Sequence, residues 1–385
     1  MIERAITPHL REMARCFPVV TIMGPRQSGK TTLAKQVFPD HAYVNLEDPA
    51  AFRIAASDPK AFFELYKPPV IIDEVQRVPE LLSSVQILAD STERRGMFIL
   101  TGSHQPAFHA KISQSLAGRT GILKLLPLSI RELSNAEIRL ERDEYLFNGF
   151  MPRLYNEKIP PSMLYSAYYA TYVERDVRQL INVRNQHAFE TFLRLLAGRV
   201  GQVVNLNSLA GDVGVSSTTL AEWLSVLEAS YIVFRLPCYF NNFGKRLIKA
   251  PKIYFTEVGL AVYLLGIENV SQVARDPLLG GLFENLVVAE ALKARFNAGK
   301  QLPELYYYRV QGQHEVDLLI NNGRTLIPVE IKAGKTFDPS FANELRRFIS
   351  FAGDCCNPTV LYSGDASVEI NGIRFDSFRN VANLL

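Results

Sequence analysis

The 385-residue sequence has no apolar run long enough to cross a membrane, and its first residues lack the basic-then-apolar layout of a secretory signal. Its four cysteines have no metal-ligand spacing and its six histidines form no cluster, so neither a disulfide framework nor a zinc site is expected. The sequence also contains no internal repeat and no low-complexity segment. These absences favour a globular protein of the reducing cytoplasm, without a membrane partner.

An excess of charge of one sign is also nearly missing, since 42 basic residues face 39 acidic ones. The formal net charge of +3 is too small to indicate a nucleic-acid partner, so that case must rest on local patches. The 48% hydrophobic and 21% charged residues are typical of a folded chain, and the length exceeds what one hydrophobic core usually supports. We therefore expect domains over residues 1–135, 136–270 and 271–385.

The first feature that the sequence does contain is a phosphate-binding loop, Gly24-Pro25-Arg26-Gln27-Ser28-Gly29-Lys30-Thr31. An apolar run before it predicts a buried strand, and the residues after it predict a helix. Such a loop points backbone N–H groups at phosphates; Lys30 would neutralise them and the Thr31 hydroxyl would hold Mg²⁺. ATP and Mg²⁺ are the expected cofactors. The predicted nucleotide-binding residues are Gly24, Pro25, Arg26, Gln27, Ser28, Gly29, Lys30, Thr31 and Thr32.

Acidic and hydroxyl side chains follow two later strands. Asp73 ends an apolar strand and is expected to complete the Mg²⁺ shell, while Glu74 is expected to orient and deprotonate the attacking water. The strand at 97–101 leads to Ser103, the candidate contact to the γ-phosphate or the water, with Thr101 as second choice. These residues predict ATP hydrolysis. The strands expected to form a parallel α/β sheet are 18–23, 43–46, 70–73, 97–101 and 121–126.

Residues 205–230 have the hydrophobic spacing of a helix-turn-helix, and two β-rich segments follow, as in a winged helix. The second helix has no Lys or Arg and carries Glu222 and Glu228, so a structural or protein-binding role remains as open as DNA reading. Between 235 and 252 stand five basic residues, several aromatic residues and no acid. This basic wing (residues 235–252) makes DNA a candidate partner; the alternative is a solvated loop.

Near the C-terminus, two apolar strands flank an Asn-Gly turn and predict a hairpin. If Ile320 pairs with Thr325, Asp317 lies opposite Pro328 and Glu315 lies opposite Glu330. Since side chains alternate along strands, Glu315, Asp317, Glu330 and Lys332 would project from one face. Such carboxylates could hold Mg²⁺ and activate water for phosphodiester cleavage.

Asp317 with Glu330-Ile331-Lys332 resembles the PD-(D/E)XK nuclease motif, in which a helical acid upstream often completes the site; Glu284 fits that position. The predicted set is Glu284, Asp317 and Glu330 around a metal, with Lys332 as catalytic lysine. Two alternatives stay open. One is a surface salt-bridge ladder, and the other is a nuclease fold whose metal site has become a binding surface.

As a whole, the chain resembles the prokaryotic AAA-type ATPases that end in a domain of unknown function with a restriction-endonuclease-like core. The resemblance implies ATP hydrolysis in rings or switches, where a neighbouring subunit of a homo-oligomer supplies an arginine. Arg119 is the candidate for that role, and a local salt bridge is its alternative. The segments that carry the resemblance are Gly24 to Thr32, Val70 to Gln76, Leu100 to Ser103, Ser115 to Arg119, Pro251 to Phe255, Phe283 to Asn285, Glu315 to Asp317 and Glu330 to Lys332.

The expected architecture is an α/β protein: a parallel-sheet P-loop AAA ATPase domain, a helical and winged-helix module, and an α/β restriction-endonuclease-like domain. The expected function is Mg²⁺-dependent ATP hydrolysis coupled to the binding or processing of nucleic acid. The alternative is an ATP-gated switch that binds protein partners and has a non-cleaving nuclease-like domain.

Overall fold

The computed structural model describes residues 2–102, 115–177, 185–239, 250–310, 314–323, 325–350, 352 and 355–385. They form two compact units. The first contains Met1–Leu128, Ala229–Tyr231 and Phe296–Gln301, and the second contains Ser129–Glu228, Ile232–Arg295 and Leu302–Leu385. The expected three-domain boundaries, 1–135, 136–270 and 271–385, stay predictions.

The first unit is built on a parallel five-stranded sheet in the order β2-β3-β4-β1-β5, which confirms the predicted α/β sheet. Its strands are β1 (Val19–Met23), β2 (Ala42–Asn45), β3 (Val70–Asp73), β4 (Phe98–Gly102) and β5 (Thr120–Lys124). Its helices are α1 (Thr7–Cys16), α2 (Lys30–Val37), α3 (Pro49–Ser57), α4 (Pro59–Leu65), the short 3₁₀ helix η1 (Val75–Arg77) and α5 (Leu81–Asp90).

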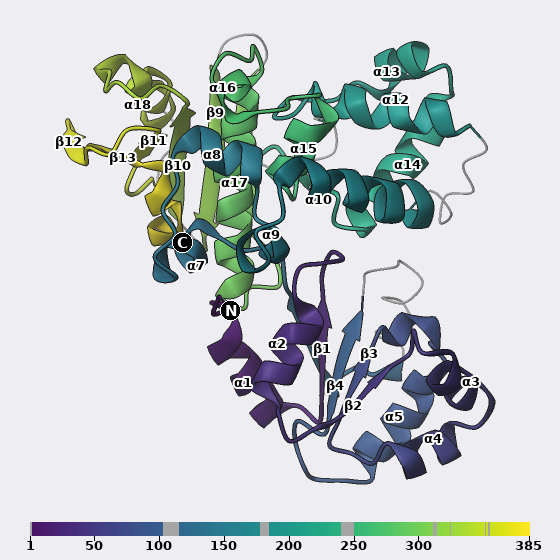
Figure 1. Ribbon diagram of the computed structural model, residues 1–385. Helices are drawn as coiled ribbons and strands as arrows, with labels where there is room; N and C mark the ends of the chain where they lie inside the picture. Colours follow the sequence, from purple (N-terminus) through teal and green to yellow (C-terminus); the bar gives the residue numbers. More distant parts are fainter. Residues whose placement is uncertain are drawn as a thin grey trace. The chain divides into compact units, whose positions relative to one another are not determined.

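Alternating strand side chains give this sheet two buried faces. Val20 and Ile22 pack with Leu10 and Leu33 on one face, the side of α1 and α2 in Figure 1. Val19, whose side chain points to the opposite face, belongs to the core formed with α3, α4 and α5. Because helices cover both faces, the strands read as continuous apolar runs. The carboxyl ends of the strands are left to carry polar residues.

The second unit begins with helices and a small antiparallel pair, β6 (Val233–Leu236) with β7 (Lys252–Phe255). The two helices expected within 205–230 are present as α13 and α14, and Ser216 accepts the Thr219 N–H at 3.1 Å, as a capping residue does. The winged-helix assignment stays a prediction, because residues 240–249 lie outside the described residues. The helices are α7 (Ile130–Asn135), α8 (Arg142–Asn148), α9 (Pro152–Asn156), α10 (Pro161–Tyr168), the π-helical η2 (Tyr169–Val177), α12 (Gln186–Ala197), α13 (Leu206–Val213), α14 (Ser217–Ala229), α15 (Val258–Leu264) and α16 (Val270–Val273).

The same unit contains a six-stranded mixed sheet in the order β12-β13-β11-β10-β9-β8, beside the long helix α17 (Leu279–Asn297) in Figure 1. The pairs β8–β9, β9–β10 and β12–β13 are antiparallel, and β10–β11 and β11–β13 are parallel. The remaining elements are β8 (Leu305–Val310), β9 (His314–Asn322), β10 (Thr325–Lys332), η4 (Pro339–Ala342), α18 (Asn343–Ile349), β11 (Thr359–Tyr362), β12 (Val368–Ile370), β13 (Ile373–Ser377) and η5 (Phe378–Leu384).

The predicted hairpin is confirmed as β9–β10, but its predicted register is wrong by two residues. Asn322 pairs with Thr325 and Leu319 pairs with Pro328, where the sequence analysis paired Ile320 with Thr325. The reason lies at the turn, because the pairing continues as far as Asn322 with Thr325, and Gly323 follows Asn322 at φ 80°, a conformation that favours glycine. A shift of two preserves the alternation, so the predicted acidic face survives the correction.

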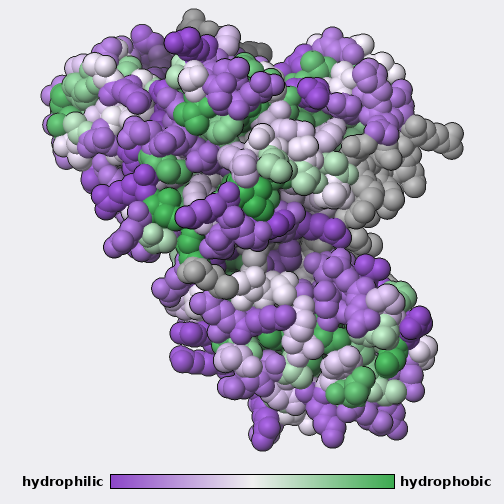
Figure 2. Space-filling view, in the orientation of Figure 1, coloured by the Kyte–Doolittle hydropathy of each residue, from purple (hydrophilic) through white to green (hydrophobic). Residues whose placement is uncertain are grey.

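The surface in Figure 2 is mainly hydrophilic on the visible face, with hydrophobic residues scattered in small patches. Over the described part of the chain, the search for a helix sufficiently long and apolar to cross a membrane finds no candidate. The exposed large hydrophobic residues among those described include Leu65, Ile87, Met163, Leu302 and Val368.

Candidate functional sites

The phosphate loop runs from the end of β1 to the first turn of α2, as predicted. Gly29 precedes the helix at φ 91°, a conformation that favours glycine. A Cβ on Gly24 would lie 2.0 Å from the backbone oxygen of Leu125, so no side chain fits there. Both glycines are therefore required by the backbone path itself.

Lys30 is buried inside the loop that it follows. Its Nζ donates to the backbone oxygens of Gly24 at 3.1 Å and Pro25 at 2.8 Å. Burial lowers the pKa of this ammonium to about 8, although Glu74 and Asp73 nearby act in the opposite direction. The group still carries its charge at neutral pH, and its present acceptors are carbonyl oxygens that phosphate oxygens could replace.

The Arg4 side chain is hydrogen-bonded to the backbone of the phosphate loop. The sequence alone does not predict this contact. The Arg4 guanidinium donates to the backbone oxygens of Ser28 at 2.7 Å and Leu126 at 2.6 Å, and the residue is buried. The Ser28 hydroxyl and the Gln27 side-chain oxygen are buried without a hydrogen-bond partner in the described residues. The chemistry of the loop fits the phosphates of a nucleotide, because it offers backbone N–H groups, the Lys30 ammonium and polar side-chain atoms without a partner in the described residues. No motif marks Arg4, because the contact depends on how the N-terminal segment folds back.

Asp73, at the carboxyl end of β3, gathers the hydroxyl groups of its neighbours. Thr31 and Tyr43 each donate to Oδ2 at 2.9 Å, and Thr101 donates to Oδ1. Thr31 and Asp73, the predicted magnesium residues, are thus in contact, and their hard oxygens suit Mg²⁺. Burial, followed by the negative charge of Asp73, raises the pKa of Tyr43. Tyr43 carried no sequence signal, since a tyrosine on an apolar strand is usually a packing residue.

The remaining predicted ATP-site residues lie in different settings. Glu74 directly follows Asp73 with φ 55°, and its carboxylate accepts a hydrogen bond from the Gln76 side chain. Arg119 makes a forked pair with exposed Asp90, at 2.5 Å and 2.9 Å, which is the local salt bridge given as its alternative. The role of Arg119 in a neighbouring subunit stays a prediction. Ser103 lies outside the described residues.

A second polar site lies in the second unit. The structure gathers the acids of the predicted nuclease motif into one group, here called the carboxylate cluster (Glu284, Glu315, Asp317 and Glu330). Glu284 comes from α17, Glu315 and Asp317 from β9, and Glu330 from β10. Lys332 Nζ lies 2.5 Å from Glu330 Oε1, and the Ile331 N–H donates to Asp317 Oδ2 at 2.9 Å.

Lys252, at the start of β7, forms ion pairs with two of these acids. Its Nζ lies 2.7 Å from Glu284 Oε1 and also bonds Glu315, while the Tyr254 hydroxyl donates to the same Glu284 oxygen at 2.5 Å. The sequence analysis counted Lys252 with the basic wing. That assignment is wrong, because its side chain is only 3% exposed and is paired with carboxylates. Arg235, at the other end of the wing, pairs with Glu228 at 3.0 Å.

The electrostatics of the cluster reflect acids packed close together. Burial, with Asp317 as the next cause, raises the pKa of Glu284 to about 7 and that of Glu330 to about 8. Glu330 Oε2 is buried without a partner in the described residues. Within the part of the chain described, however, no three His, Cys, Asp or Glu side chains are grouped so that they could hold a metal ion. As it is described, the site is a lysine-filled cluster and does not fit the predicted metal centre.

The edge of β7 fixes the position of Lys252. The Asn285 side chain accepts the Phe255 N–H at 2.7 Å and donates to the Phe255 oxygen at 2.8 Å. The Ile253 oxygen accepts the Gly201 N–H at 3.0 Å. Because side chains alternate along a strand, Lys252 and Tyr254 project from the same face of β7, and both reach Glu284. In the sequence, Lys252-Ile253-Tyr254-Phe255 predicts a β-strand but gives no sign that Lys252 is buried.

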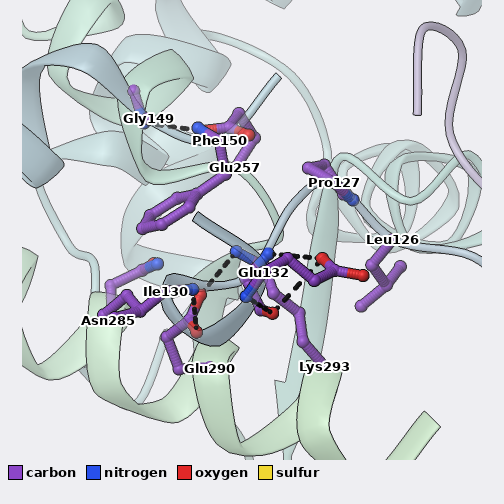
Figure 3. Close-up of polar contacts among 12 residues, drawn as sticks. Leu126, Pro127, Ile130, Glu132, Gly149, Phe150, Glu257, Asn285, Glu290 and Lys293 are labelled. Atoms are coloured by element: carbon purple, nitrogen blue, oxygen red, sulfur yellow. Dashed lines mark hydrogen bonds and ion pairs between the residues drawn. The ribbon is translucent and has the colours of Figure 1, made fainter. Parts of the chain in front are cut away.

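A third polar group, drawn in Figure 3, has a structural role. Glu290 on α17 accepts the Ile130 N–H at 2.8 Å and lies 2.8 Å from Lys293 Nζ. The Lys293 ammonium also lies 3.7 Å from the centre of the Phe150 ring. Burial raises the pKa of Glu290 and of Glu257, whose Oε1 accepts the Phe150 N–H at 2.9 Å. These contacts fasten short helical segments to α17 and to the loop before α15.

The chain is similar to three described families. Residues 17–134 match the family model of an AAA domain, and residues 139–271 and 279–379 match two domains of unknown function (DUF8612 and DUF4143). The first unit's sheet and loop lie in the AAA segment, Lys252 lies in the second segment, and Glu284, Asp317, Glu330 and Lys332 lie in the third. Residues from two family segments therefore meet in the carboxylate cluster.

Among curated proteins, the chain is 33% identical over 354 residues to the uncharacterized proteins Mb2031c of Mycobacterium bovis and Rv2008c of Mycobacterium tuberculosis, covering 90% of this chain and 77% of each relative. An uncharacterized protein of Haemophilus influenzae is 22% identical, covering 79% and 86%. Among solved structures, the Walker-type ATPase of Pyrococcus abyssi is 15% identical with a TM-score of 0.41, covering 69% of this chain and 96% of that one. AMPPCP-bound DnaA from Aquifex aeolicus is 13% identical with a TM-score of 0.28, covering 58% and 85%.

Proposed function

We propose, since the chain belongs to the family of the two mycobacterial proteins and its first part is an AAA-type P-loop ATPase domain, that it binds ATP with Mg²⁺ and hydrolyses it. The observation that carries the proposal is the contact between the loop and the strand-end acid, in which Thr31 Oγ1 donates to Asp73 Oδ2 at 2.9 Å. A strand, a glycine loop and a helix N-terminus place backbone N–H groups for phosphates. Thr31 and Asp73 supply hard oxygens at the same place.

Each residue then has a definite role. Lys30 exchanges its carbonyl acceptors for the phosphate oxygens, and the loop N–H groups from Gly29 onward share that negative charge. Thr31 and Asp73 would hold Mg²⁺, which would supply positive charge against the negative charge that develops on the phosphates. Glu74 orients the attacking water and accepts its proton. Ser103 is the proposed contact to the γ-phosphate, with Thr101 second, although the Thr101 hydroxyl is directed at Asp73.

The downstream task that we propose is the binding or processing of nucleic acid. Support comes from the basic residues of the wing that remain after Lys252 is removed from it, above all Lys245, Arg246 and Lys249. The gathering of Asp317, Glu330 and Lys332 on one face supports descent from a nuclease. Ring assembly, with Arg119 of one copy reaching the ATP of the next, is the proposed basis for coupling.

The second candidate is an ATP-gated switch that binds a protein partner and cleaves nothing. A specific observation favours it, because the ammonium of Lys252 sits among the acids on which cleavage would depend. The second helix of the helix-turn-helix also carries Glu222 and Glu228, which a phosphate backbone would repel.

One experiment separates these functions. ATP hydrolysis is measured with and without single-stranded, duplex and branched DNA and RNA, and particle size is measured with a non-hydrolysable nucleotide. Stimulation by one nucleic acid, lost when Lys245 and Arg246 are both changed to Gln, supports the first function. Hydrolysis that no nucleic acid alters supports the switch. No heat of binding with ATP or GTP in calorimetry on the folded protein would refute both.

A further inference from the structure

Outside the ATP site, the structure contains a buried cation that is paired with two acids of the carboxylate cluster. Lys252 comes from the segment matched to one family, while the acids around it come from the segment matched to another. Its Nζ is held by Glu284 at 2.7 Å and by Glu315, and the side chain is 3% exposed. A lysine in this setting is not a surface ion pair, because water does not screen it.

We propose that Lys252 is an internal counter-ion that occupies the place of a divalent cation in the carboxylate cluster, so that the cluster as the structure describes it does not fit such a cation. Replacing this ammonium by an uncharged side chain would free the acids to regroup around one. The inference rests on the proposed nuclease descent of the hairpin. It does not depend on ATP hydrolysis.

Two structural observations and one chemical preference support the proposal. Lys252 and Tyr254 converge on the same oxygen of Glu284, so the helical acid is directed at the lysine. Glu330 Oε2 is buried and without a partner in the described residues, so the cluster keeps an oxygen able to accept a further cation. Hard carboxylate oxygens are the ligands that Mg²⁺ and Mn²⁺ prefer.

Electrostatics give the direction of the effect. A divalent ion bound by these carboxylates would be repelled by the ammonium across a poorly solvated space, where charges interact more strongly than in water. Replacing Lys252 by an uncharged residue removes that repulsion and releases carboxylate oxygens. Tyr254→Phe is the matched control, because it removes a donor from the same Glu284 oxygen without changing any charge.

The test is Mn²⁺ binding to the full chain without nucleotide, followed by the electron paramagnetic resonance signal of free Mn²⁺. All variants carry Thr31→Ala so that the ATP site does not contribute. Lys252→Met is expected to bind one Mn²⁺ at least about tenfold more tightly than any residual, Asp317-independent binding measured with the unchanged cluster, as removal of one nearby like charge requires. Tyr254→Phe and Lys252→Arg are expected to stay within about twofold of it, and adding Asp317→Asn to Lys252→Met should abolish the gain.

Circular dichroism and thermal melting establish that each variant is folded, and Lys252→Gln replaces Lys252→Met if the latter does not fold. Equal Mn²⁺ affinity in the folded neutral variants and in the unchanged cluster overturns the proposal. So does an unchanged cluster that already binds Mn²⁺ in an Asp317-dependent way. Because no ATP is present, failure here is distinct from failure of the proposed ATPase function.

Discussion

The ATP site and the carboxylate cluster differ in the sign of the charge that they gather and in how that charge is compensated. The ATP site presents a lysine, loop N–H groups and a buried arginine, and its cations are bonded mainly to neutral carbonyl oxygens. The carboxylate cluster presents acids and brings its own ammonium groups, Lys252 and Lys332, into direct ion pairs. Lys30 of the first site is thus bonded to carbonyl oxygens that the oxygens of an external anion could replace, whereas acids of the second site already form ion pairs within the chain. Ligand binding should dominate the behaviour of the first and internal pairing that of the second.

The largest expected effect concerns the ATP site and is a loss of ATP turnover. Lys30→Ala removes the buried ammonium and should lower ATP turnover by at least about 100-fold, the range for losing one transition-state donor. Steady-state hydrolysis and calorimetric ATP binding measure it. Lys35→Ala, five positions later on α2 and exposed, is the control. Near-normal turnover in Lys30→Ala would mean that the loop is not the nucleotide site.

Glu74→Gln should separate binding from chemistry. Because the amide cannot accept a proton from water, turnover should fall by about 100-fold while ATP affinity changes little. Single-turnover hydrolysis and equilibrium binding are compared with those of the exposed control Glu64→Gln. Unchanged turnover removes Glu74 from the mechanism, and lost binding makes it a structural residue.

Arg4→Met examines the support beneath the phosphate loop. Leaving the buried oxygens of Ser28 and Leu126 unpaired should reduce the free energy of unfolding by about 2 kcal/mol and raise KM for ATP more than it lowers kcat. Denaturant titration and kinetics measure these changes. Arg11→Met, an exposed change on the neighbouring α1, should stay within about 0.5 kcal/mol. Equal effects in both variants would contradict a specific role for Arg4.

The smallest expected effect concerns the carboxylate cluster and is a change in how the stability of the folded chain depends on pH. The pKa of Glu330 is about 8 in the folded chain against 4.5 in the unfolded chain, so the folded chain binds more protons between those values. The contribution of this group to stability should therefore decrease as pH rises from about 4.5 to 8. Thermal melting across that range should show a shallower decline in Glu330→Gln. A variant with the same or a steeper decline would contradict the assignment.

The sequence was enough to place the phosphate loop between a strand and a helix and Asp73 at a strand end, because each belongs to a continuous segment, while the roles of these residues toward ATP stay predictions. A contiguous loop specifies its own conformation, and Asp73 ends a recognisable strand; Arg4 and Tyr43 were missed because only the tertiary fold brings them to the loop. For the second site, strand alternation was enough to place Asp317 and Glu330 on one face despite a register error of two residues. Lys252 could not be assigned, since a basic residue next to other basic residues gives no indication of burial.

The side-chain amide of Asn285 also affects whether the edge of β7 can pair with another strand. With its two bonds to Phe255 and those of residues 201 and 202 to Ile253, it occupies the backbone edge that β7 would otherwise offer to another strand. The small β6–β7 pair is thus protected against recruiting a foreign chain, the usual hazard of an exposed sheet edge. It is also protected against sliding, since a slip of one residue would put Ile253 among the acids. The Asn285 side chain and the backbone of residues 201 and 202 therefore act together against mispairing of β7, and the buried position of Lys252 acts against misregistration.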